Sequence, residues 1–179
     1  MGRLVSVTQA QGVRQRLRRQ GKTVVFTNGI FDLLHIGHVR YLQAASELGH
    51  ALFVGLNSDS STRKLRGPGR PLIPQAERAE VLCALACVDY VVIFDEPTAE
   101  RLVETLQPDV YAKGGDYAAE VSGAGEAGPA SGEKGKALPE ASVVKSYGGR
   151  IVILPYTTGH STTQIVQRIL NETEPHLGG

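Results

Sequence analysis

The sequence predicts a single α/β domain, residues 1–179, built on a five-stranded parallel sheet with helices on both faces. Short apolar runs alternate along the chain with segments in which apolar residues recur at helical spacing. Such alternation is typical of parallel strands joined by right-handed helical crossovers. Turns rich in Gly and polar residues follow the apolar runs, and 179 residues suffice for one domain with a sizeable core.

The first helix is expected at residues 8–20, with Val13 and Leu17 facing inward and Gly21 as its stop. An apolar run at residues 23–26 predicts the first strand. The arginines of the helix are expected to form a solvated face rather than a nucleic-acid site; they are Arg14, Arg16, Arg18 and Arg19.

The stretch that organises the chain follows this strand and reads TNGIFDLLHIGHVRY at residues 27–41. Gly29 breaks the strand, and a helix that ends at Gly49 begins near the two histidines. The spacing of His35 and His38 puts both rings on one side of a helix start. Because free N–H groups and the helix dipole favour anions there, the pair indicates phosphate chemistry. A zinc site needs about three protein ligands, and no third ligand has suitable spacing nearby.

The second strand, residues 51–56, ends in the polar cluster Asn57-Ser58-Asp59, as expected at the ligand edge of an open parallel sheet. The next stretch, residues 63–71, mixes Gly and Pro with cations and is not expected to form a regular helix. It is either a solvated loop or a mobile clamp on triphosphate and acidic substrate, and we favour the clamp. Its cations are Arg63, Lys64, Arg66 and Arg70.

Two further helix–strand units follow. Pro74 starts a helix through Cys87, with Ala79, Leu82, Leu85 and Ala86 inward, and residues 88–94 form the third strand. Thr98 can cap a helix through Gln107, and residues 109–112 form the fourth strand. The inward side of that helix is expected to consist of Leu102, Val103 and Leu106.

The remaining chain begins with a Gly/Ala-rich segment, about residues 118–138, expected to be a flexible insertion without chemistry. A short helix at residues 139–147 and a fifth strand at residues 150–154 follow. The hydroxyl-rich residues 157–163 then start a last helix, where the hydroxyls either cap the helix or donate to phosphate, and we favour phosphate. The inward face of this helix is expected to be Ile165, Val166, Ile169 and Leu170.

Composition bounds the function. The net charge of +1 gives no general attraction to nucleic acid or membrane. No apolar run reaches the roughly 18 residues of a membrane span, and no secretory signal opens the chain. Cys83 and Cys87 are expected on one helix as core residues, not as a disulfide framework, which suits a cytoplasmic location.

The motifs resemble those of the cytidylyltransferase-like nucleotidyltransferases. The tetrad HIGH at residues 35–38, preceded by GIFD at residues 29–32, marks that superfamily. The segments KGGDY at residues 113–117 and RGPGRP at residues 66–71 are more specific and resemble the D-glycero-D-manno-heptose 1-phosphate adenylyltransferases. LNSDSS, VDYVVIFDE and HSTTQI carry the resemblance through nearly the whole chain.

Three features depart from the family's pattern. Ile30 stands where a small residue or Cys is expected, with a minor effect. The insertion at about residues 118–138 could alter assembly or a lid. Tyr156 stands where related cytidylyltransferases carry Arg, which weakens a cytidylyl reading.

The resemblance implies a Rossmann-like fold and adenylyl transfer from ATP to a sugar 1-phosphate, with Mg²⁺ on the triphosphate and no metal ligand from the protein. His35 and His38 would hold the α- and β-phosphates, assisted by Lys64. Acceptor contacts would come from Asp32, Asp59, Arg66 and Arg70. Nucleotide contacts would come from Thr27, Asn28, Gly29, Ile30, Phe31, Gly37, Asn57, Lys113, Gly114, Gly115, Asp116, Ser161, Thr162 and Thr163.

Alternatives stay open at this point. One is a sibling cytidylyltransferase acting on glycerol 3-phosphate or another small phosphorylated acceptor. Another is a nucleotide-binding sensor without turnover, which the presence of both histidines disfavours. A dinucleotide oxidoreductase is disfavoured because no G-x-G-x-x-G follows the first strand. Relatives of this family suggest a homo-oligomer.

Overall fold

The computed structural model describes residues 1–115, 138–155 and 162–173. Within these ranges one sheet of six parallel strands has the order β1-β4-β3-β2-β5-β6. The α/β prediction is confirmed. The strands are β1 (Arg3–Leu4), β2 (Val24–Gly29), β3 (Ala51–Asn57), β4 (Tyr90–Phe94), β5 (Val110–Gly114) and β6 (Arg150–Leu154).

The count of five strands was one too low. The additional strand, β1, is a two-residue edge strand in which Arg3 pairs with Tyr90 and Leu4 with Val91 of β4. Two residues carry no period in their hydrophobicity, so the sequence pattern could not mark them as a strand.

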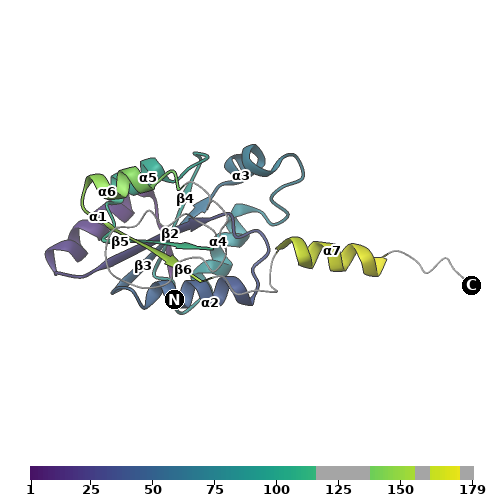
Figure 1. Cartoon of the computed structure of the whole chain (residues 1–179), viewed down its shortest axis with the longest axis horizontal. Helices are drawn as coiled ribbons and strands as arrows, with labels where there is room; N and C mark the ends of the chain where they lie inside the picture. Colours follow the sequence, from purple (N-terminus) through teal and green to yellow (C-terminus); the bar gives the residue numbers. More distant parts are fainter. Residues whose placement is uncertain (116–137, 156–161, 174–179) are drawn as a thin grey trace, which may run out of the picture.

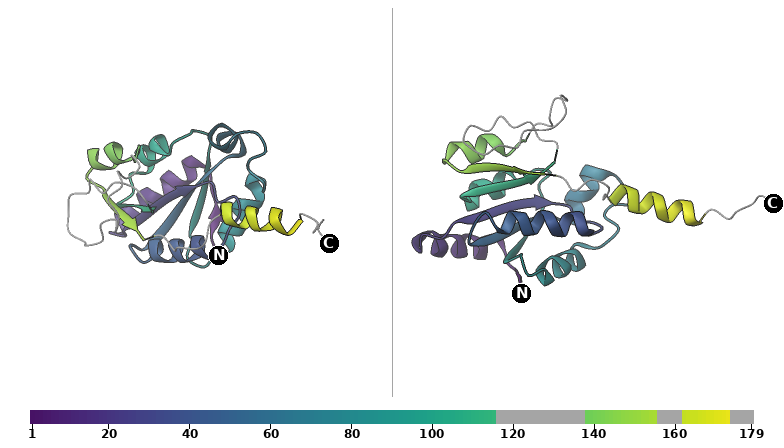
Figure 2. Two further views of the ribbon diagram at one scale, coloured as in Figure 1. Left: turned by 45° about the vertical axis from the view of Figure 1, so that its right-hand side comes forward. Right: turned by 60° about the horizontal axis from the view of Figure 1, so that its bottom comes forward.

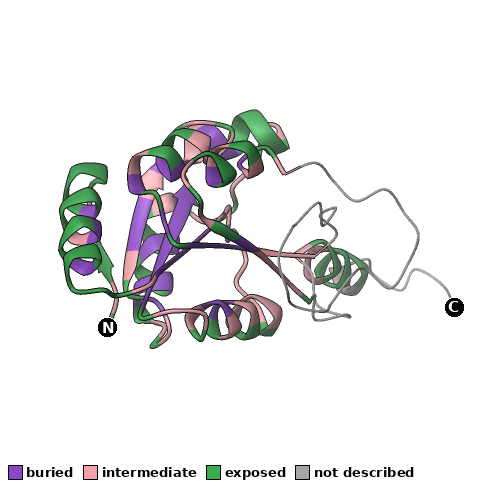
Figure 3. Cartoon of the chain, turned by 60° about the vertical axis from the view of Figure 1, so that its left-hand side comes forward, coloured by how far each residue is buried: buried purple, intermediate pink, exposed green. Residues whose placement is uncertain are grey.

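Helices cover both faces of the sheet (Figure 1). Helices α1 (Val7–Arg19), α5 (Glu100–Leu106) and α6 (Ala141–Ser146) pack on one face, and α2 (Ile36–Ser46) and α4 (Gln75–Ala84) on the other. Successive residues of a strand serve opposite cores, as where Phe26 faces the first set of helices and Val25 the second. Figure 3 shows the result, buried strands between helices whose outer sides are exposed.

The strand order reverses between β2 and β5, which creates the crevice where open α/β sheets bind ligands. The chain leaves β2 for β3 and β4 on one side and later returns to place β5 on the other side of β2. The carboxyl ends of β2 and β5, at Gly29 and Gly114, therefore flank the crevice.

Two helices lie outside the layers. Helix α3 (Asp59–Arg66) directly follows β3, and α7 (Thr162–Thr173) leads away from the body of the sheet (Figures 1 and 2). The expected inward face of α7 is wrong in part: Ile165 and Val166 are half-buried, but Ile169 and Leu170 are 54% and 59% exposed because the helix projects beyond the sheet. Of the described helices, none combines the length and apolarity needed to cross a membrane.

The arginines of α1 do not all form the expected solvated face. Arg14 is buried, its Nη2 pairs with Asp109 at 2.9 Å, and its Nε and Nη2 donate to the carbonyl of Gln107. Asp109 also accepts from the N–H of Val24 at 2.7 Å. Arg14 lies on the buried stripe between Ala10 and Leu17, so the helical period places it inward.

The basic stretch is more regular than predicted. Helix α3 continues through Arg63, Lys64 and Arg66 and ends at Gly67, whose φ of +88° an L side chain rarely adopts. The helix breakers therefore act only from Gly67 onward, and the irregular segment is residues 67–74.

Helices α4 and α5 begin or end differently from the predictions. Helix α4 stops at Ala84 because Leu85 is extended, so Cys87 lies beyond it and Ala86 is exposed. Thr98 does not cap α5; its hydroxyl donates to the Glu100 side chain at 2.7 Å. The cap comes from far along the chain, because the Glu140 carboxylate accepts from the N–H of Ala99 at 2.9 Å. Most of the expected insertion, residues 116–137, lies outside the described residues.

Candidate active site

A cavity of about 860 Å³ opens at the switch point, within the size range of small-molecule sites. A smaller lobe of about 170 Å³ adjoins it between β2, β5 and α2. Of the residues predicted for the site, those that line one or both spaces are Asn28, Gly29, Ile30, Phe31, Asp32, His35, Gly37, His38, Asn57, Arg66, Arg70, Lys113, Gly114, Thr162 and Thr163.

His35 is the N-cap of α2. Its Nδ1 accepts the N–H of Gly37 at 3.1 Å, and its extended backbone precedes the first helical turn. A neutral imidazole that accepts at Nδ1 carries its proton on Nε2, so local backbone geometry fixes the tautomer. The ring thus has the Nε2–H donor that a phosphate oxygen requires.

His38 lies against His35, with ring centroids 4.0 Å apart, and the edge of Phe31 contacts its other side at 5.4 Å. Burial, followed by the neighbouring His35, lowers the pKa of His38 to about 4. Its Nδ1 is buried without a hydrogen-bond partner among the described residues. A buried polar atom of this kind is typical of a site that is completed by a ligand or water.

The turn before the histidines is tightly built. Phe31 has a φ of +49°, a left-handed conformation that costs energy for a bulky residue and clusters at functional sites. A Cβ on Gly29 would lie 3.0 Å from the Phe31 ring, so Gly29 lets that ring turn back against the strand. The turn brings Phe31 under His38 and presents the free N–H groups of α2 to the cavity.

Lys113 enters the cavity from β5. Its Nζ donates to Asn28 Oδ1 at 2.9 Å, and Tyr111 donates to the same oxygen at 2.7 Å. Burial lowers the pKa of Lys113, partly offset by the charge of Glu140. With its carbonyl oxygen held by two donors, the Asn28 amide is fixed in orientation at the end of β2.

Thr27 lies one layer behind the cavity wall. It is fully buried, and its hydroxyl shares a 2.6 Å hydrogen bond with Tyr41, which also donates to the carbonyl of Ala112 at 3.0 Å. Tyr41 itself lines the smaller lobe, close against Gly114. The side-chain hydrogen bond of Thr27 is therefore to Tyr41, and through it Thr27 supports the smaller lobe from β2.

The expected acceptor residue Asp32 holds the segment after α3. Its Oδ2 pairs with Arg70 at 2.9 Å, and its Oδ1 accepts from the N–H groups of Leu72 and Ile73 at 2.7 and 3.0 Å. Arg70 and Arg66 line the cavity, whereas Lys64 is exposed and lines neither space. Arg66, rather than Lys64, therefore faces the cavity.

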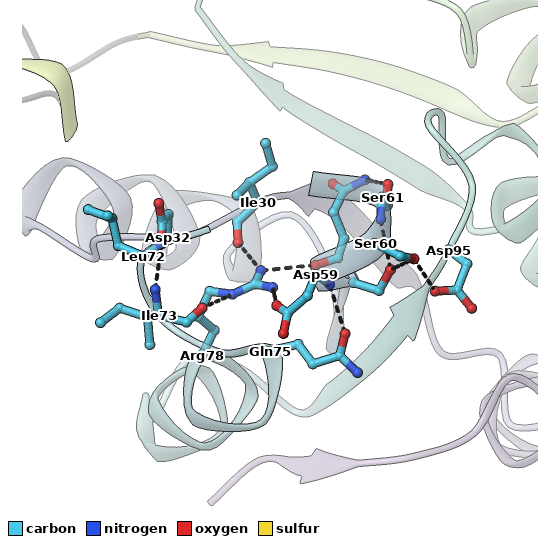
Figure 4. A network of polar contacts seen from close by, with 12 residues as sticks. Ile30, Asp32, Asp59, Ser60, Ser61, Leu72, Ile73, Gln75, Arg78 and Asp95 are labelled. Atoms are coloured by element: carbon cyan, nitrogen blue, oxygen red, sulfur yellow. Dashed lines mark hydrogen bonds and ion pairs between the residues drawn. The ribbon is translucent and has the colours of Figure 1, made fainter. Parts of the chain in front are cut away.

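Arg78, which sequence reasoning missed, lies at the centre of a polar network below this segment (Figure 4). It is 1% exposed, pairs with Asp59 at 2.7 Å, and donates to the carbonyls of Ile30, Asn57 and Ile73. It thereby joins the ends of β2 and β3 to the start of α4. Its position one residue before Ala79 and four before Leu82, on the buried side of α4, was the available signal. Asp59 serves this network and lines neither space.

Glu140 is a second residue that sequence reasoning missed. It is 3% exposed and lines the cavity, and its charge acts on Lys113. Nothing in the sequence distinguished it from a solvated helix-start carboxylate.

The hydroxyl cluster meets the histidines in the main cavity. Thr162 and Thr163 line it together with His35 and His38, and Thr162 Oγ1 lies 3.5 Å from the carbonyl of Leu33. Gly115 donates to Leu154 at the end of the sheet and lines neither space. Asp116 and Ser161 lie outside the described residues, as does Tyr156.

Metal ligands do not gather in the described ranges: no group of three or more His, Cys, Asp and Glu side chains there could hold an ion. The two carboxylates nearest the histidine turn, Asp32 and Asp59, are paired with Arg70 and Arg78. With both carboxylates engaged in ion pairs, the site fits a cation that arrives bound to a triphosphate and is held by phosphate oxygens and water.

One crevice of the parallel sheet brings together the N-terminus of α2, two imidazoles, a buried lysine and threonine hydroxyls. All of these groups can bind phosphate oxygens. This fold and this site define a nucleotidyltransferase.

The chain belongs to the cytidylyltransferase-like family, whose model matches residues 26–168. The bifunctional protein HldE of Syntrophotalea carbinolica is 54% identical over 157 residues, which cover 88% of this chain and 29% of that protein. HldE of Streptomyces coelicolor is 50% identical over 153 residues, covering 86% of this chain and 30% of that protein. The chain thus spans less than a third of the length of these curated relatives.

Solved structures agree on the fold. A lipopolysaccharide core biosynthesis protein from Thermoplasma volcanium matches 76% of this chain and 98% of its own, with a TM-score of 0.55 and 25% identity. Pantoate-beta-alanine ligase from Francisella tularensis, in complex with beta-gamma ATP and beta-alanine, matches 96% of this chain and 77% of its own, with a TM-score of 0.55. At 12% identity the second likeness concerns the fold alone.

Proposed function

We propose that this nucleotidyltransferase transfers AMP from ATP to a heptose 1-phosphate and releases pyrophosphate. The observation that carries the proposal is the meeting of the adjacent His35 and His38 rings, at the N-terminus of α2, with Thr162 and Thr163 in one cavity. The KGGDY and RGPGRP motifs and the identity of about half to the HldE proteins support ATP and a heptose phosphate as substrates.

In the proposed reaction a phosphate oxygen of the acceptor attacks the α-phosphorus of ATP, and the bond from that phosphorus to the oxygen bridging to the β-phosphate breaks. No enzyme nucleophile is needed, so catalysis rests on positioning and on stabilising charge. The Nε2–H of His35 donates to an α-phosphate oxygen, and His38 steadies the charge that develops on the departing bridging oxygen.

The remaining phosphates of ATP and of the acceptor would be bound by other residues that line the cavity. Thr162, Thr163 and the N–H groups of α7 bind the β- and γ-phosphates. Arg66 and Arg70 hold the acceptor phosphate, and Lys113 and Asn28 hold the nucleotide at the switch point. Mg²⁺, bound with ATP, supplies neutralising charge on the triphosphate.

The test is a crossed assay of pyrophosphate release, with ATP or CTP offered against heptose 1-phosphate or glycerol 3-phosphate. Release only with ATP and heptose 1-phosphate supports the proposal. Release with CTP and glycerol 3-phosphate would select the cytidylyltransferase that the family's description admits. No release with any pair would favour a nucleotide-binding sensor. A homo-oligomer in the cytoplasm remains part of this proposal, and light scattering on the purified chain tests the oligomer.

A further inference from the structure

The main cavity is lined by two chemically different groups of residues. One group comprises the histidines, Arg66, Arg70 and Lys113, all suited to phosphate oxygens. The other group, here called the polar wall, consists of Thr62, Pro97, Thr98 and Glu140. Because this wall carries a carboxylate, it would repel phosphate, whereas a carboxylate and a hydroxyl are good partners for neutral hydroxyl groups.

The first feature of the polar wall is the buried hydroxyl of Thr62. It is fully buried on α3, it lines the cavity, and its Oγ1 has no hydrogen-bond partner among the described residues. Most buried hydroxyls find a partner, so an unpaired one in a cavity wall calls for a group that arrives with a ligand or water. The neighbouring Ser61, by contrast, donates to the carbonyl of Glu96 at 2.7 Å.

The second feature of the polar wall is the buried carboxylate of Glu140. It is 3% exposed, and its Oε1 accepts from the N–H of Ala99 at 2.9 Å. No hydrogen bond to its Oε2 is seen among the described residues. Glu140 and α3 are fastened to the same segment, residues 96–99, through Ala99 and through the Ser61–Glu96 bond. The two side chains therefore belong to one wall that is held in a fixed arrangement.

We propose that the polar wall binds the hydroxyl groups of the acceptor sugar, with Thr62 Oγ1 and Glu140 Oε2 as its hydrogen-bonding atoms. The inference deepens the proposed function and rests on it for the identity of the acceptor. The acceptor's phosphate then points toward the histidines and Arg66, and its polyol body toward Thr62 and Glu140. An acceptor that keeps the phosphate but lacks sugar hydroxyls loses the wall's contribution.

The experiment measures binding by titration calorimetry on the full chain, in the presence of the non-hydrolysable analogue α,β-methylene-ATP. The probes are heptose 1-phosphate and inorganic phosphate. Thr62→Val and Glu140→Gln should each weaken heptose 1-phosphate binding about tenfold, the value of one good hydrogen bond. Binding of the ATP analogue and of inorganic phosphate should stay within about twofold.

Matched variants separate contact from structure. Thr62→Ser keeps the hydroxyl and should restore the affinity for heptose 1-phosphate. Glu140→Gln keeps an oxygen for the N–H of Ala99, so its thermal unfolding should match the parent protein. Thr105→Val removes a hydroxyl that donates to Arg101 on the exposed side of α5, and it should change no affinity.

Each outcome of the binding experiment either supports or overturns the sugar-binding role of the polar wall. Unchanged heptose 1-phosphate affinity in both wall variants would overturn the inference, as would a loss confined to the ATP analogue. If the parent protein binds heptose 1-phosphate no better than inorganic phosphate, the wall does not read the sugar. The parent protein could bind the sugar phosphate, and the variants weaken that binding, while no pair of nucleotide and acceptor releases pyrophosphate. That outcome would support the polar wall as a sugar-binding surface and would contradict the proposed function.

Discussion

The imidazole rings of His35 and His38 lie tilted by 33° to each other, with their centroids 4.0 Å apart, at the first turn of α2. His35 is held as an acceptor by the N–H of Gly37, and burial lowers the pKa of His38 to about 4. The lowered pKa favours a neutral His38 ring at pH 7. A bound triphosphate would favour the charged ring, so we expect nucleotide binding and protonation of His38 to be coupled.

The first prediction concerns turnover. His38→Ala should lower kcat by roughly 10²–10³-fold, as expected when one preorganised group at the developing charge is removed. Circular dichroism should show an unchanged fold. His50→Gln is the matched control, because His50 accepts from the N–H of Thr23 away from both spaces. Near-normal kcat in His38→Ala would contradict the catalytic role.

The two roles of His35 can be separated. His35→Ala loses both the ring and the N-cap and should cost about 1 kcal/mol in the free energy of unfolding. His35→Asn keeps a capping oxygen, so its stability in urea should match the parent protein while its kcat falls like that of His38→Ala. Equal destabilisation of the two variants would show that the cap is unimportant for stability. Normal kcat in His35→Asn would show that the ring is unimportant for turnover.

The pH dependence of stability follows from the lowered pKa of His38. Its folded pKa of about 4 lies below the usual histidine pKa of 6.5, so the unfolded chain binds the proton more tightly. The unfolding free energy should therefore fall as pH drops from about 6.5 to 4, by at most about 3 kcal/mol from this group. Urea titrations across that range should show a smaller loss in His38→Gln. An identical pH profile in that variant would contradict the assignment.

Arg78 should matter for both stability and the site. Arg78→Met leaves three carbonyls and Asp59 without their donor and should cost roughly 3 kcal/mol in the free energy of unfolding. Arg101→Met is the control, since Arg101 is 79% exposed and its 3.5 Å pair with Glu96 should contribute below about 0.5 kcal/mol. Similar unfolding midpoints for both variants would show that the Arg78 network is not stabilising.

The basic segment offers a comparison of two neighbouring cations. Arg66 lines the cavity and Lys64 does not, although both lie on α3. Arg66→Gln should raise the KM for the phosphorylated acceptor about tenfold, the loss of one charge-assisted contact. Lys64→Gln should leave that KM within about twofold. The reverse order would contradict the assignment of Arg66 to the acceptor phosphate.

Local signals in the sequence were sufficient for most of the fold. The apolar runs located five of the strands, and the Gly turn with HIGH placed the histidines on a helix start, because these features depend on neighbouring residues. What failed depends on distant partners. The burial of Arg14 needs Asp109, and the cap of α5 needs Glu140, from 41 residues away.

The candidate site shows the same division. Proximity to strand ends correctly brought Asn57, Lys113 and Thr162 to one cavity. It could not tell which side chains would already be engaged, as Asp32 is by Arg70 and Asp59 by Arg78. Such pairing is decided by tertiary packing, which also selects Arg66 over Lys64 on the same helix.

A crystal structure of the full chain with α,β-methylene-ATP would reveal the triphosphate site itself. We expect the α-phosphate to lie within hydrogen-bond distance of the His35 and His38 rings, with the terminal phosphates at Thr162 and Thr163. A triphosphate bound elsewhere, with those rings remote from its α-phosphorus, would overturn the proposed function.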